Sequence, residues 1–318
     1  SKKGVNLPNT KISLPCLTLK DLRDLDFALE NNFEWIGLSF VRSVTDIIEL
    51  KDIIRSKKKH ARVIAKIEKP EAVKEIDKII EVTDGVMVAR GDLGVEMPME
   101  QVPLLQKMIV NKCLVASKPV IIATQMMESM ITSYTPTRAE VNDVANAVLD
   151  GTDVVMLSEE SAVGEDPINV VDTMHNIIAK TEDIYNFDKQ YKFAYLDEFD
   201  VIQATVTKLA DDLKANGILA LTSSGKSAQK MSRYRPRTPI FTFTHKKKVL
   251  NSLTAVWGVE PIETIKEAHA SKMFQKMLKS LEKIGKLKKD GLYVATVGYP
   301  VGMPGSTNTI KILTPSEI

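Results

Sequence analysis

The stretch GVMVARGDLGVEMP, residues 85–98, joins an apolar run directly to a charged turn. Residues 85–89 have the composition of a buried strand, and Arg90, Gly91 and Asp92 follow without any polar transition. We predict a strand over residues 84–92 that ends on Asp92. Because glycine has no Cβ, Gly91 lets the backbone approach a ligand closely. The stretch therefore predicts a binding site at the end of a buried strand.

The same alternation of strand and helix continues on both sides of this stretch. Strands are predicted over residues 35–41, 62–68, 118–125 and 152–161, and helices over 19–32, 44–57, 70–82, 102–117, 136–151 and 168–185. Five successive βα units with continuous apolar strands indicate a parallel sheet whose faces are covered by crossover helices.

A second α/β segment follows a stretch of mixed charge and aromatic residues. Its predicted helices cover residues 200–216, 225–235, 247–257 and 268–286, and its strands cover 217–223, 239–244, 258–262, 292–299 and 308–314. We therefore predict a first domain over residues 1–185, a linker over 186–200 and a second domain over 201–318.

Composition narrows the possible partners and the compartment. The chain has 318 residues, is 44% hydrophobic and carries a net charge of +2, so we expect no nucleic-acid partner. No apolar run is long enough for a membrane span, so we expect no membrane partner. Two cysteines form no disulfide framework, which favours a reducing, cytoplasmic location. The first residues resemble a loop from the middle of a protein, so we expect the chain to start inside a larger fold.

Polar side chains follow four consecutive predicted strands, at the point where each strand ends. They are Lys66, Glu68, Asp92, Thr124, Gln125, Ser158 and Glu160. In a parallel barrel these strand ends meet at one mouth, where active sites lie. Two carboxylates there suit a hard cation such as Mg²⁺, which keeps positions open for substrate oxygens. The sequence therefore predicts a metal site at Glu68 and Asp92, with the ammonium of Lys66 beside it.

Simpler interpretations of the same residues remain open. Lys66 with Glu68, and Arg90 with Asp92, would each also make a local ion pair at a sheet edge. The amides of Gly91 and Asp92 could bind an anion. Thr124 could hydrogen-bond an anionic substrate or merely fill space as a β-branched residue. Four aligned strands favour the site over the isolated ion pairs.

The second segment contains a hydroxyl-rich loop between a predicted strand and helix. Its residues are Thr222, Ser223, Ser224, Gly225, Lys226 and Ser227. Backbone N–H groups, hydroxyls and one lysine can form a phosphate pocket. An ordinary serine-rich helix cap explains the loop equally well. A second glycine loop, residues 298–308, could fold over the same pocket.

Several longer stretches resemble pyruvate kinases, in the order that this family has them. They are KGVNLP (3–8), IAKIEKPEAV (64–73), DGVMVARGDLGVE (84–96), PVIIATQMMESM (119–130) and PTRAEVNDVANAVLDGTDVVMLSEESAVGEDP (136–167). The resemblance implies an α/β fold: part of a (β/α)8 TIM-type barrel, about five βα units, followed by a separate α/β C-terminal regulatory domain. It implies phosphoryl transfer from phosphoenolpyruvate to ADP, giving pyruvate and ATP, which is the final step of glycolysis.

The resemblance also implies roles for individual residues. Lys66 would stabilise the transferring phosphoryl group and the enolate, and Glu68 and Asp92 would hold Mg²⁺ or Mn²⁺. The amides of Gly91 and Asp92, with Thr124, would bind the substrate carboxylate. Ser158 and Glu160 would belong to the network that protonates enolpyruvate. The loop from Thr222 to Ser227 would bind a sugar-phosphate or similar effector.

The family resemblance further implies K⁺ as a cofactor and a homotetramer. The family's first three barrel strands and its lid come before KGVNLP. With them lie the K⁺ ligands and much of the nucleotide site, so this chain by itself is expected to be incomplete for catalysis.

Two other functions fit the sequence. The chain could be a non-catalytic effector-binding or assembly fragment, since the hydroxyl-rich loop is intact. It could also be another metal-dependent enzyme that forms a pyruvate enolate, such as an aldolase or lyase, because that chemistry uses the same pair of carboxylates.

Overall fold

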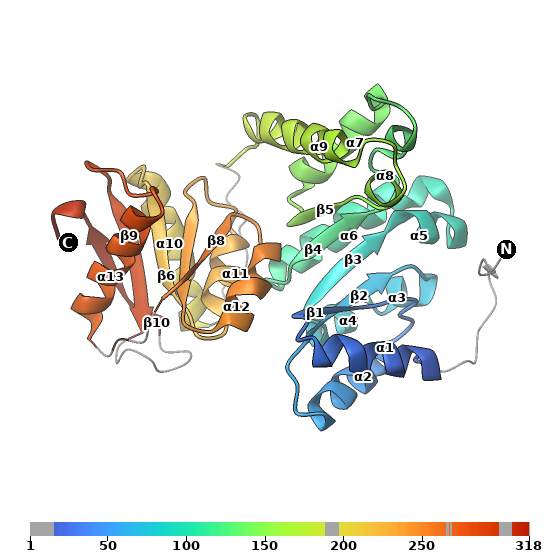
Figure 1. The fold of residues 1–318 in the computed structure, drawn as a ribbon, viewed down its shortest axis with the longest axis horizontal. Helices are drawn as coiled ribbons and strands as arrows, with labels where there is room; N and C mark the ends of the chain where they lie inside the picture. The colour runs from blue at the N-terminus through green and yellow to red at the C-terminus, as the bar shows by residue number, and fades with distance from the viewer. Residues whose placement is uncertain (1–15, 188–196, 265–266, 268, 299–306, 318) are drawn as a thin grey trace. The chain divides into compact units, whose positions relative to one another are not determined.

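The computed structural model describes residues 16–187, 197–264, 267, 269–298 and 307–317. The chain divides into two compact units, Ser1–Tyr185 and Asn186–Ile318 (Figure 1). KGVNLP lies outside the described residues, as do most of the predicted linker and of the predicted glycine loop at 298–308. Helix α10 (Glu198–Asp212) begins inside the range predicted as linker.

The first unit contains a five-stranded parallel sheet in the order β1-β2-β3-β4-β5. The strands are β1 (Trp35–Leu38), β2 (Arg62–Ile67), β3 (Gly85–Ala89), β4 (Val120–Ala123) and β5 (Val154–Met156). Sequence order and spatial order coincide, as they do in successive βα units of a barrel. The predicted five-stranded parallel sheet is confirmed.

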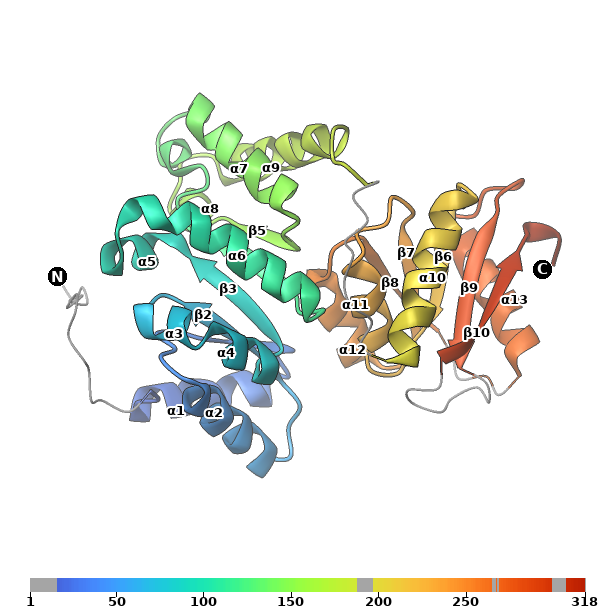
Figure 2. The same ribbon diagram turned by 180° about the vertical axis from the view of Figure 1, so that it is seen from behind.

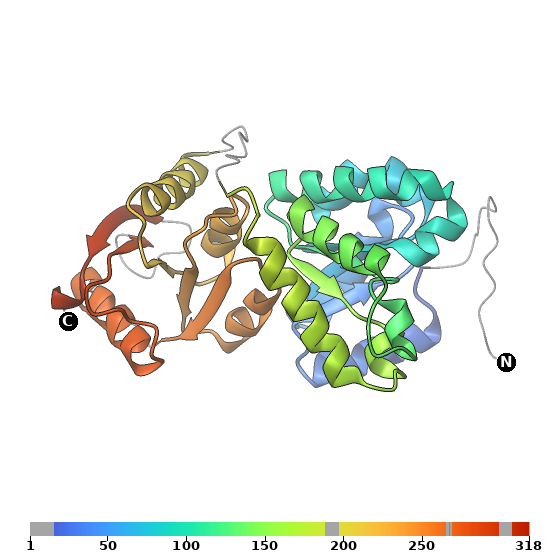
Figure 3. The same cartoon turned by 90° about the horizontal axis from the view of Figure 1, so that it is seen from above.

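Helices precede, connect and follow these strands, and neighbouring long helices pack against one another. They are α1 (Leu19–Glu30), α2 (Val44–Ser56), α3 (Pro70–Lys74), α4 (Ile76–Val82), α5 (Arg90–Glu96), α6 (Val102–Val115), α7 (Arg138–Asp150), α8 (Glu159–Ala162) and α9 (Pro167–Glu182), with the 3₁₀ turns η1 (Met99–Gln101) and η2 (Glu128–Ile131). Helices α4 and α6 lie in front of the strands when the unit is seen from behind (Figure 2). Figure 3 shows the helices arranged around the strands from above.

Burial along β2 separates its two faces. Val63, Ala65 and Ile67 are fully buried, whereas the alternate positions Ile64 and Lys66 are only partly covered. Successive strand side chains point to opposite faces, so Lys66 projects from the face opposite to the fully buried residues. Strand β3 is buried at all five positions, as expected for the middle of a parallel sheet.

Several predicted strands end earlier in the structure than the sequence suggests, and two of these differences affect the site. Strand β3 ends at Ala89 and α5 begins at Arg90, so Asp92 lies in the first turn of a helix. Strand β5 ends at Met156, and Glu160 lies in α8. The positive end of a helix dipole stabilises a carboxylate in the first turn, so the acidic residues here are compatible with helices that begin early. The helix predicted over residues 70–82 is two helices, interrupted at Glu75.

The second unit is a five-stranded sheet in the order β10-β9-β6-β7-β8, parallel except for β10. Its strands are β6 (Gly217–Leu221), β7 (Ile240–Thr244), β8 (Val259–Glu263), β9 (Tyr293–Gly298) and β10 (Thr307–Leu313). Its other elements are α10, α11 (Lys226–Ser232), α12 (Lys247–Ser252), α13 (Ala270–Lys283), η3 (Leu253–Ala255) and η4 (Pro315–Glu317).

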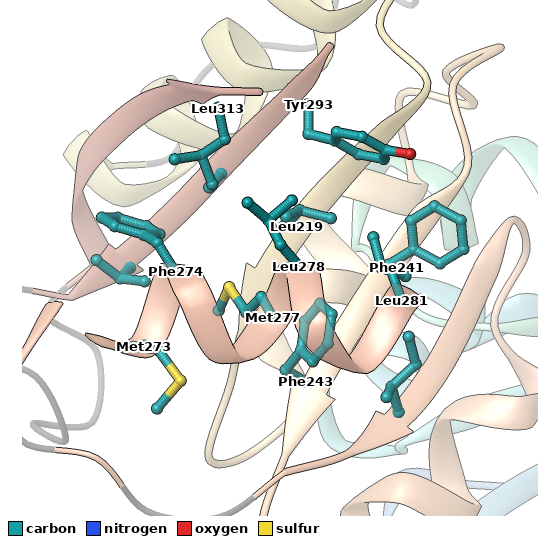
Figure 4. Close-up of a cluster of buried hydrophobic side chains, with 13 residues drawn as sticks. Leu219, Phe241, Phe243, Met273, Phe274, Met277, Leu278, Leu281, Tyr293 and Leu313 are labelled. Carbon is teal, nitrogen blue, oxygen red and sulfur yellow. The ribbon is translucent and has the colours of Figure 1, made fainter. Parts of the chain in front are cut away.

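Both faces of this second sheet are packed. Helix α13 buries Phe274, Met277 and Leu281 against one face, where Leu219 and Phe243 of the sheet meet them (Figure 4). These helix positions recur at intervals of three and four residues, which is the period of a single apolar stripe. On the other face, α10 and α11 pack on alternate positions of the same strands. The α/β character predicted for this segment is therefore confirmed.

Candidate functional site

Lys66 and Glu68 meet at the carboxyl end of β2. The Lys66 ammonium lies 2.7 Å from Glu68 Oε1 and donates a hydrogen bond to Ser39 Oγ at 2.9 Å. Glu68 Oε2 accepts a hydrogen bond from the backbone N–H of Phe40 at 2.6 Å. Glu68 is only 1% exposed, whereas about a quarter of the Lys66 side chain remains accessible. Lys66 and Glu68 thus form an ion pair at the end of β2, in which Lys66 is the accessible partner.

Asp92 does not pair with Arg90, which contradicts the simple ion-pair interpretation of that motif. The Arg90 Nη1 atom lies 2.6 Å from Asp143 Oδ2 on α7. Within the part of the chain that the structure describes, the Asp92 carboxylate has no hydrogen bond or ion pair. Asp92 is partly exposed in the first turn of α5. Its oxygens are therefore available to a ligand.

Gly91 and Thr124, both predicted as substrate-binding residues, are in contact. The Gly91 N–H donates to Thr124 Oγ1 at 2.8 Å, and the Thr124 hydroxyl donates to the carbonyl of Ala123 at 2.6 Å. A Cβ on residue 91 would lie 3.3 Å from Thr124 Oγ1. Glycine at this position therefore allows the close approach of the two segments.

A strained turn carries Thr124. Thr124 and Gln125 have φ angles of +69° and +53°, in the left-handed region that a β-branched residue rarely adopts. The Nη2 atom of Arg90 donates to the carbonyls of both residues, at 2.7 and 3.1 Å, and lies 2.8 Å from Met126 Sδ. The Arg90 side chain is 10% exposed. Arg90 thus braces the turn that presents Thr124.

Ser158 and Glu160 also lie together, but not on an extended strand as predicted. Glu160 is 2% exposed, and its two oxygens accept hydrogen bonds from the backbone N–H groups of Ser158, at 2.7 Å, and Met127, at 3.2 Å. Ser158 occupies the position before α8, with backbone angles φ −123° and ψ −104°, and its side chain makes no capping hydrogen bond. The carboxylate of Glu160 therefore ties the end of β5 to the segment after β4.

A capping box next to this region contains a carboxylate with a shifted pKa. Glu140 accepts hydrogen bonds from the N–H and hydroxyl groups of Ser129 and Thr137. Burial raises the pKa of Glu140, but these hydrogen bonds outweigh it and hold the pKa below its ordinary value of 4.5. The box fixes the start of α7, which carries Asp143.

Sequence reasoning missed three groups at this site. Ser39 and Phe40 follow β1 and contact Lys66 and Glu68, and the polar residue after the run WIGL was a signal that could have revealed them. The bracing role of Arg90 was missed because its partners lie far along the chain. The pair Lys69–Glu96 was missed for the same reason.

The donor set suits a hard divalent cation that shares its coordination with substrate. In the described part of the chain, no cluster of three or more His, Cys, Asp or Glu side chains is placed to hold a metal alone. Mg²⁺ is commonly bound through one or two carboxylates, with waters and substrate phosphates completing its shell. Glu68 and Asp92 follow neighbouring, paired strands, and both side chains are carboxylates.

Among the described residues β1 is an edge strand of its sheet, and it borders a pocket of about 760 Å³. Apolar residues of α1 and β1 line this pocket together with the acidic side chains of Asp21 and Asp24, with Arg42, and with Ser39, Phe40 and Lys69. The pocket therefore reaches from the edge of the sheet to the residues that contact Glu68.

In the second unit the hydroxyl-rich loop is compact. The hydroxyl of Thr222 accepts a hydrogen bond from the Gly225 N–H at 2.9 Å, and Gly225 adopts a left-handed φ of +88°. Thr222 and Ser227 are buried, and Ser227 Oγ lies 3.5 Å from Thr307 Oγ1 on β10. Ser224 and Lys226 are exposed, and Ser223 is partly covered. The exposed loop residues could bind a phosphorylated ligand.

No helix in the described ranges has both the length and the apolar composition required to cross a bilayer.

Comparison with known proteins identifies the family of both units. The family model described as "Pyruvate kinase, barrel domain" matches residues 1–171, and "Pyruvate kinase, alpha/beta domain" matches residues 200–313. The chain is 42% identical over 323 aligned residues to the pyruvate kinase of Geobacillus stearothermophilus, with 100% of the chain and 55% of that protein covered.

Two further relatives agree. The pyruvate kinase of Clostridium acetobutylicum is 41% identical over 98% of this chain and 67% of its own length. Pyruvate kinase 2 of Synechocystis is 43% identical over 98% of this chain and 53% of its own length. The chain thus spans between about half and two thirds of the length of these curated relatives. By these matches the chain belongs to the pyruvate kinase family.

Proposed function

We propose that this protein transfers the phosphoryl group of phosphoenolpyruvate to ADP, forming pyruvate and ATP, the last step of glycolysis. The observation that carries the proposal is the contact of Lys66 with Glu68 at the end of β2, next to a strand whose following helix presents Asp92. Two carboxylates that would hold a divalent cation, and one ammonium, lie at or just after the carboxyl ends of neighbouring strands. Together the cation and the ammonium would neutralise the negative charge of the phosphoryl group during transfer.

In the proposed reaction, a β-phosphate oxygen of ADP attacks the phosphorus while the bond between phosphorus and the enol oxygen breaks. Negative charge develops on that enol oxygen, and the Lys66 ammonium stabilises it by direct electrostatic attraction. Mg²⁺ or Mn²⁺ held by Glu68 and Asp92 would supply charge neutralisation of the phosphoryl oxygens and of the substrate. K⁺ is a further cofactor in this proposal.

The Thr124 turn would position the substrate carboxylate. The Thr124 hydroxyl accepts a hydrogen bond from the Gly91 N–H, and Asp92 follows Gly91 in the first turn of α5. A substrate carboxylate needs hydrogen-bond donors there, and a divalent cation held by Asp92 would offset the repulsion between the two carboxylates. Binding would redirect the Gly91 N–H from Thr124 Oγ1, and the Thr124 hydroxyl from the Ala123 carbonyl, to the substrate.

Protonation at the terminal carbon of the enolate completes pyruvate. Ser158 lies at the end of β5, with its N–H held by Glu160. We assign the Ser158 hydroxyl to the network that delivers this proton, and we assign Glu160 to holding Ser158 in place.

Replacement of Lys66 tests the reaction. We expect Lys66→Met in the complete natural protein to lower kcat by about 10²–10³-fold, the loss typical of removing one group that stabilises developing charge. The assay couples pyruvate formation to NADH oxidation with phosphoenolpyruvate, ADP, Mg²⁺ and K⁺. Lys57→Met is the matched control, because Lys57 pairs with Asp26 at the surface of the first unit. Unchanged turnover in Lys66→Met would refute the role of Lys66.

We also propose that the loop from Thr222 to Ser227 binds a phosphorylated effector, such as a sugar phosphate, and that the active protein is a cytoplasmic homotetramer. Calorimetric titration with sugar phosphates tests the loop. Thr222→Val removes the acceptor for the Gly225 N–H and should abolish the heat of binding. Light scattering of the natural protein tests the tetramer.

The same experiments distinguish the alternatives. Effector binding without turnover in the natural protein would favour a non-catalytic binding module. Metal-dependent consumption of a pyruvate enolate without any need for a nucleotide would favour an aldolase or lyase.

A further inference from the structure

A buried ion pair next to the site has no part in the proposed reaction. The ammonium of Lys69 lies 2.5 Å from Glu96 Oε1, and the two side chains are only 9% and 4% exposed. Lys69 precedes α3 and Glu96 is the last residue of α5. The pair therefore joins the end of β2 to the helix that follows β3, across 27 residues of sequence.

Each partner is close in the chain to one proposed metal ligand. Lys69 directly follows Glu68 in extended backbone, with φ −126° and ψ 146°. Glu96 lies four residues after Asp92 in α5, and residues four apart share a face of a helix. The ion pair thus couples the backbone of one ligand to the helix of the other.

The end of β1 is tied to the same group. The Lys69 ammonium lies 5.9 Å from the centre of the Phe40 ring, within the range of a cation–π interaction. The Phe40 backbone N–H donates to Glu68 Oε2 at 2.6 Å. Lys69 therefore contacts a residue that orients Glu68 as well as the helix that carries Asp92.

We propose that the Lys69–Glu96 pair is a positioning device that sets the spacing of Glu68 and Asp92 for a divalent cation. The inference rests on the proposed function, because it requires those carboxylates to be the ligands. The partners cancel in charge, so the pair leaves the net charge near the metal unchanged. What it adds is a fixed connection between these two segments beyond the strand pairing of β2 with β3.

For the substitution Lys69→Met, a purely electrostatic effect and a positioning role predict opposite changes in the affinity for a divalent cation. Lys69→Met removes a cation beside two anionic ligands, so a purely electrostatic effect would tighten the binding of a divalent cation. A positioning role predicts weaker binding instead. Partners that orient metal ligands typically change metal affinity by about 10–100-fold when they are replaced.

The experiment is a titration of Mn²⁺ into the complete natural protein, followed by electron paramagnetic resonance of free and bound Mn²⁺. We expect Lys69→Met and Glu96→Gln each to weaken Mn²⁺ binding by about 10–100-fold. Lys69→Arg, which keeps the ion pair, should retain near-wild-type affinity. Lys112→Met is the matched control, since Lys112 pairs with Asp77 between α4 and α6, away from this region.

The outcomes separate this inference from the proposed function. Loss of Mn²⁺ binding in Glu68→Gln and Asp92→Asn, with unchanged or tighter binding in Lys69→Met, would overturn the positioning role alone. A wild-type protein without a Mn²⁺ site would overturn both. The charge-swapped variant with Lys69→Glu and Glu96→Lys remains informative if a single variant unfolds: a folded swapped protein with near-wild-type Mn²⁺ affinity supports the pair, and a folded swapped protein that binds Mn²⁺ at least about tenfold more weakly than wild type refutes it.

Discussion

Replacing Arg90 by methionine tests whether this side chain holds the Thr124 turn in its strained shape. Methionine has a similar length and fills much of the same volume, but it cannot donate hydrogen bonds. The substitution removes two bonds from Nη2 to the carbonyls of Thr124 and Gln125 and one ion pair to Asp143. Both turn residues keep a positive φ that costs of order 1–3 kcal/mol each and persists only when the surroundings enforce it.

The expected loss of local stability in Arg90→Met follows from these contacts. A hydrogen bond from a charged donor contributes about 1.5–3 kcal/mol, so the two carbonyl bonds together contribute about 3–6 kcal/mol. The ion pair adds at most about 1 kcal/mol, because Asp143 is 33% exposed and solvent screens it. Since the turn relaxes once the brace is gone, we expect the lower end, about 3 kcal/mol, for the loss of local stability.

Hydrogen exchange measured by mass spectrometry is the suitable assay, because the chain has two compact units and its overall unfolding need not be two-state. Exchange reports the free energy of opening of individual segments. A loss of about 3 kcal/mol should accelerate exchange of the β4 amides by about a hundredfold.

Arg55→Met is the control for this experiment, since Arg55 pairs with Asp52 on the exposed surface of α2 and its loss should change stability by less than about 0.5 kcal/mol. Equal exchange rates of β4 in Arg90→Met and Arg55→Met would show that the turn does not depend on Arg90.

Three further predictions concern packing, acid stability and thiol chemistry. Gly217→Ala should destabilise the second unit by about 1–3 kcal/mol in thermal unfolding, because the new Cβ would lie 2.5 Å from Phe241 Cε2. Glu140→Gln should lower stability above pH 4.5, and its difference from wild type should vanish as pH falls through the depressed folded pKa of Glu140; a constant difference from pH 7 to pH 3 would contradict this. Burial raises the pKa of Cys16 to about 11 and that of Cys113 further, so disulfide exchange with a chromogenic reagent at pH 8 should be about a hundredfold slower in folded than in unfolded protein.

The order and type of the elements could be predicted from the sequence because each strand has a continuous apolar run and each helix its own period. Val86, Met87 and Val88 in β3 are buried on both faces, and such a run is typical of the middle of a parallel sheet. Strand ends could not be predicted, because the decision between strand and helix at Arg90 depends on contacts with α7 and with the segment after β4. Propensity is a weak prior where tertiary contacts decide.

The candidate site was predictable to the extent that it depends on position in a strand. Lys66 and Glu68 are two apart at the end of β2, and this alternation alone places them on one face, where they are found in contact at 2.7 Å. Bonds across long stretches of sequence were not predictable. Lys69 reaches Glu96 because two buried segments approach in space, and neither residue carries a local signal of that meeting.

The charged motif at the end of β3 shows how one local prediction went wrong and why the correction matters. If residues 90–92 continued the strand, Arg90 and Asp92 would point to the same face and neutralise each other. In α5 they are two apart on a helix, where such residues do not face each other. Arg90 can then turn to Asp143 and to the carbonyls of the Thr124 turn, leaving the carboxylate of Asp92 without a cationic partner in the described chain. Because the helix begins at Arg90, the guanidinium of Arg90 serves the scaffold, and the carboxylate of Asp92 stays accessible to the divalent cation that we propose.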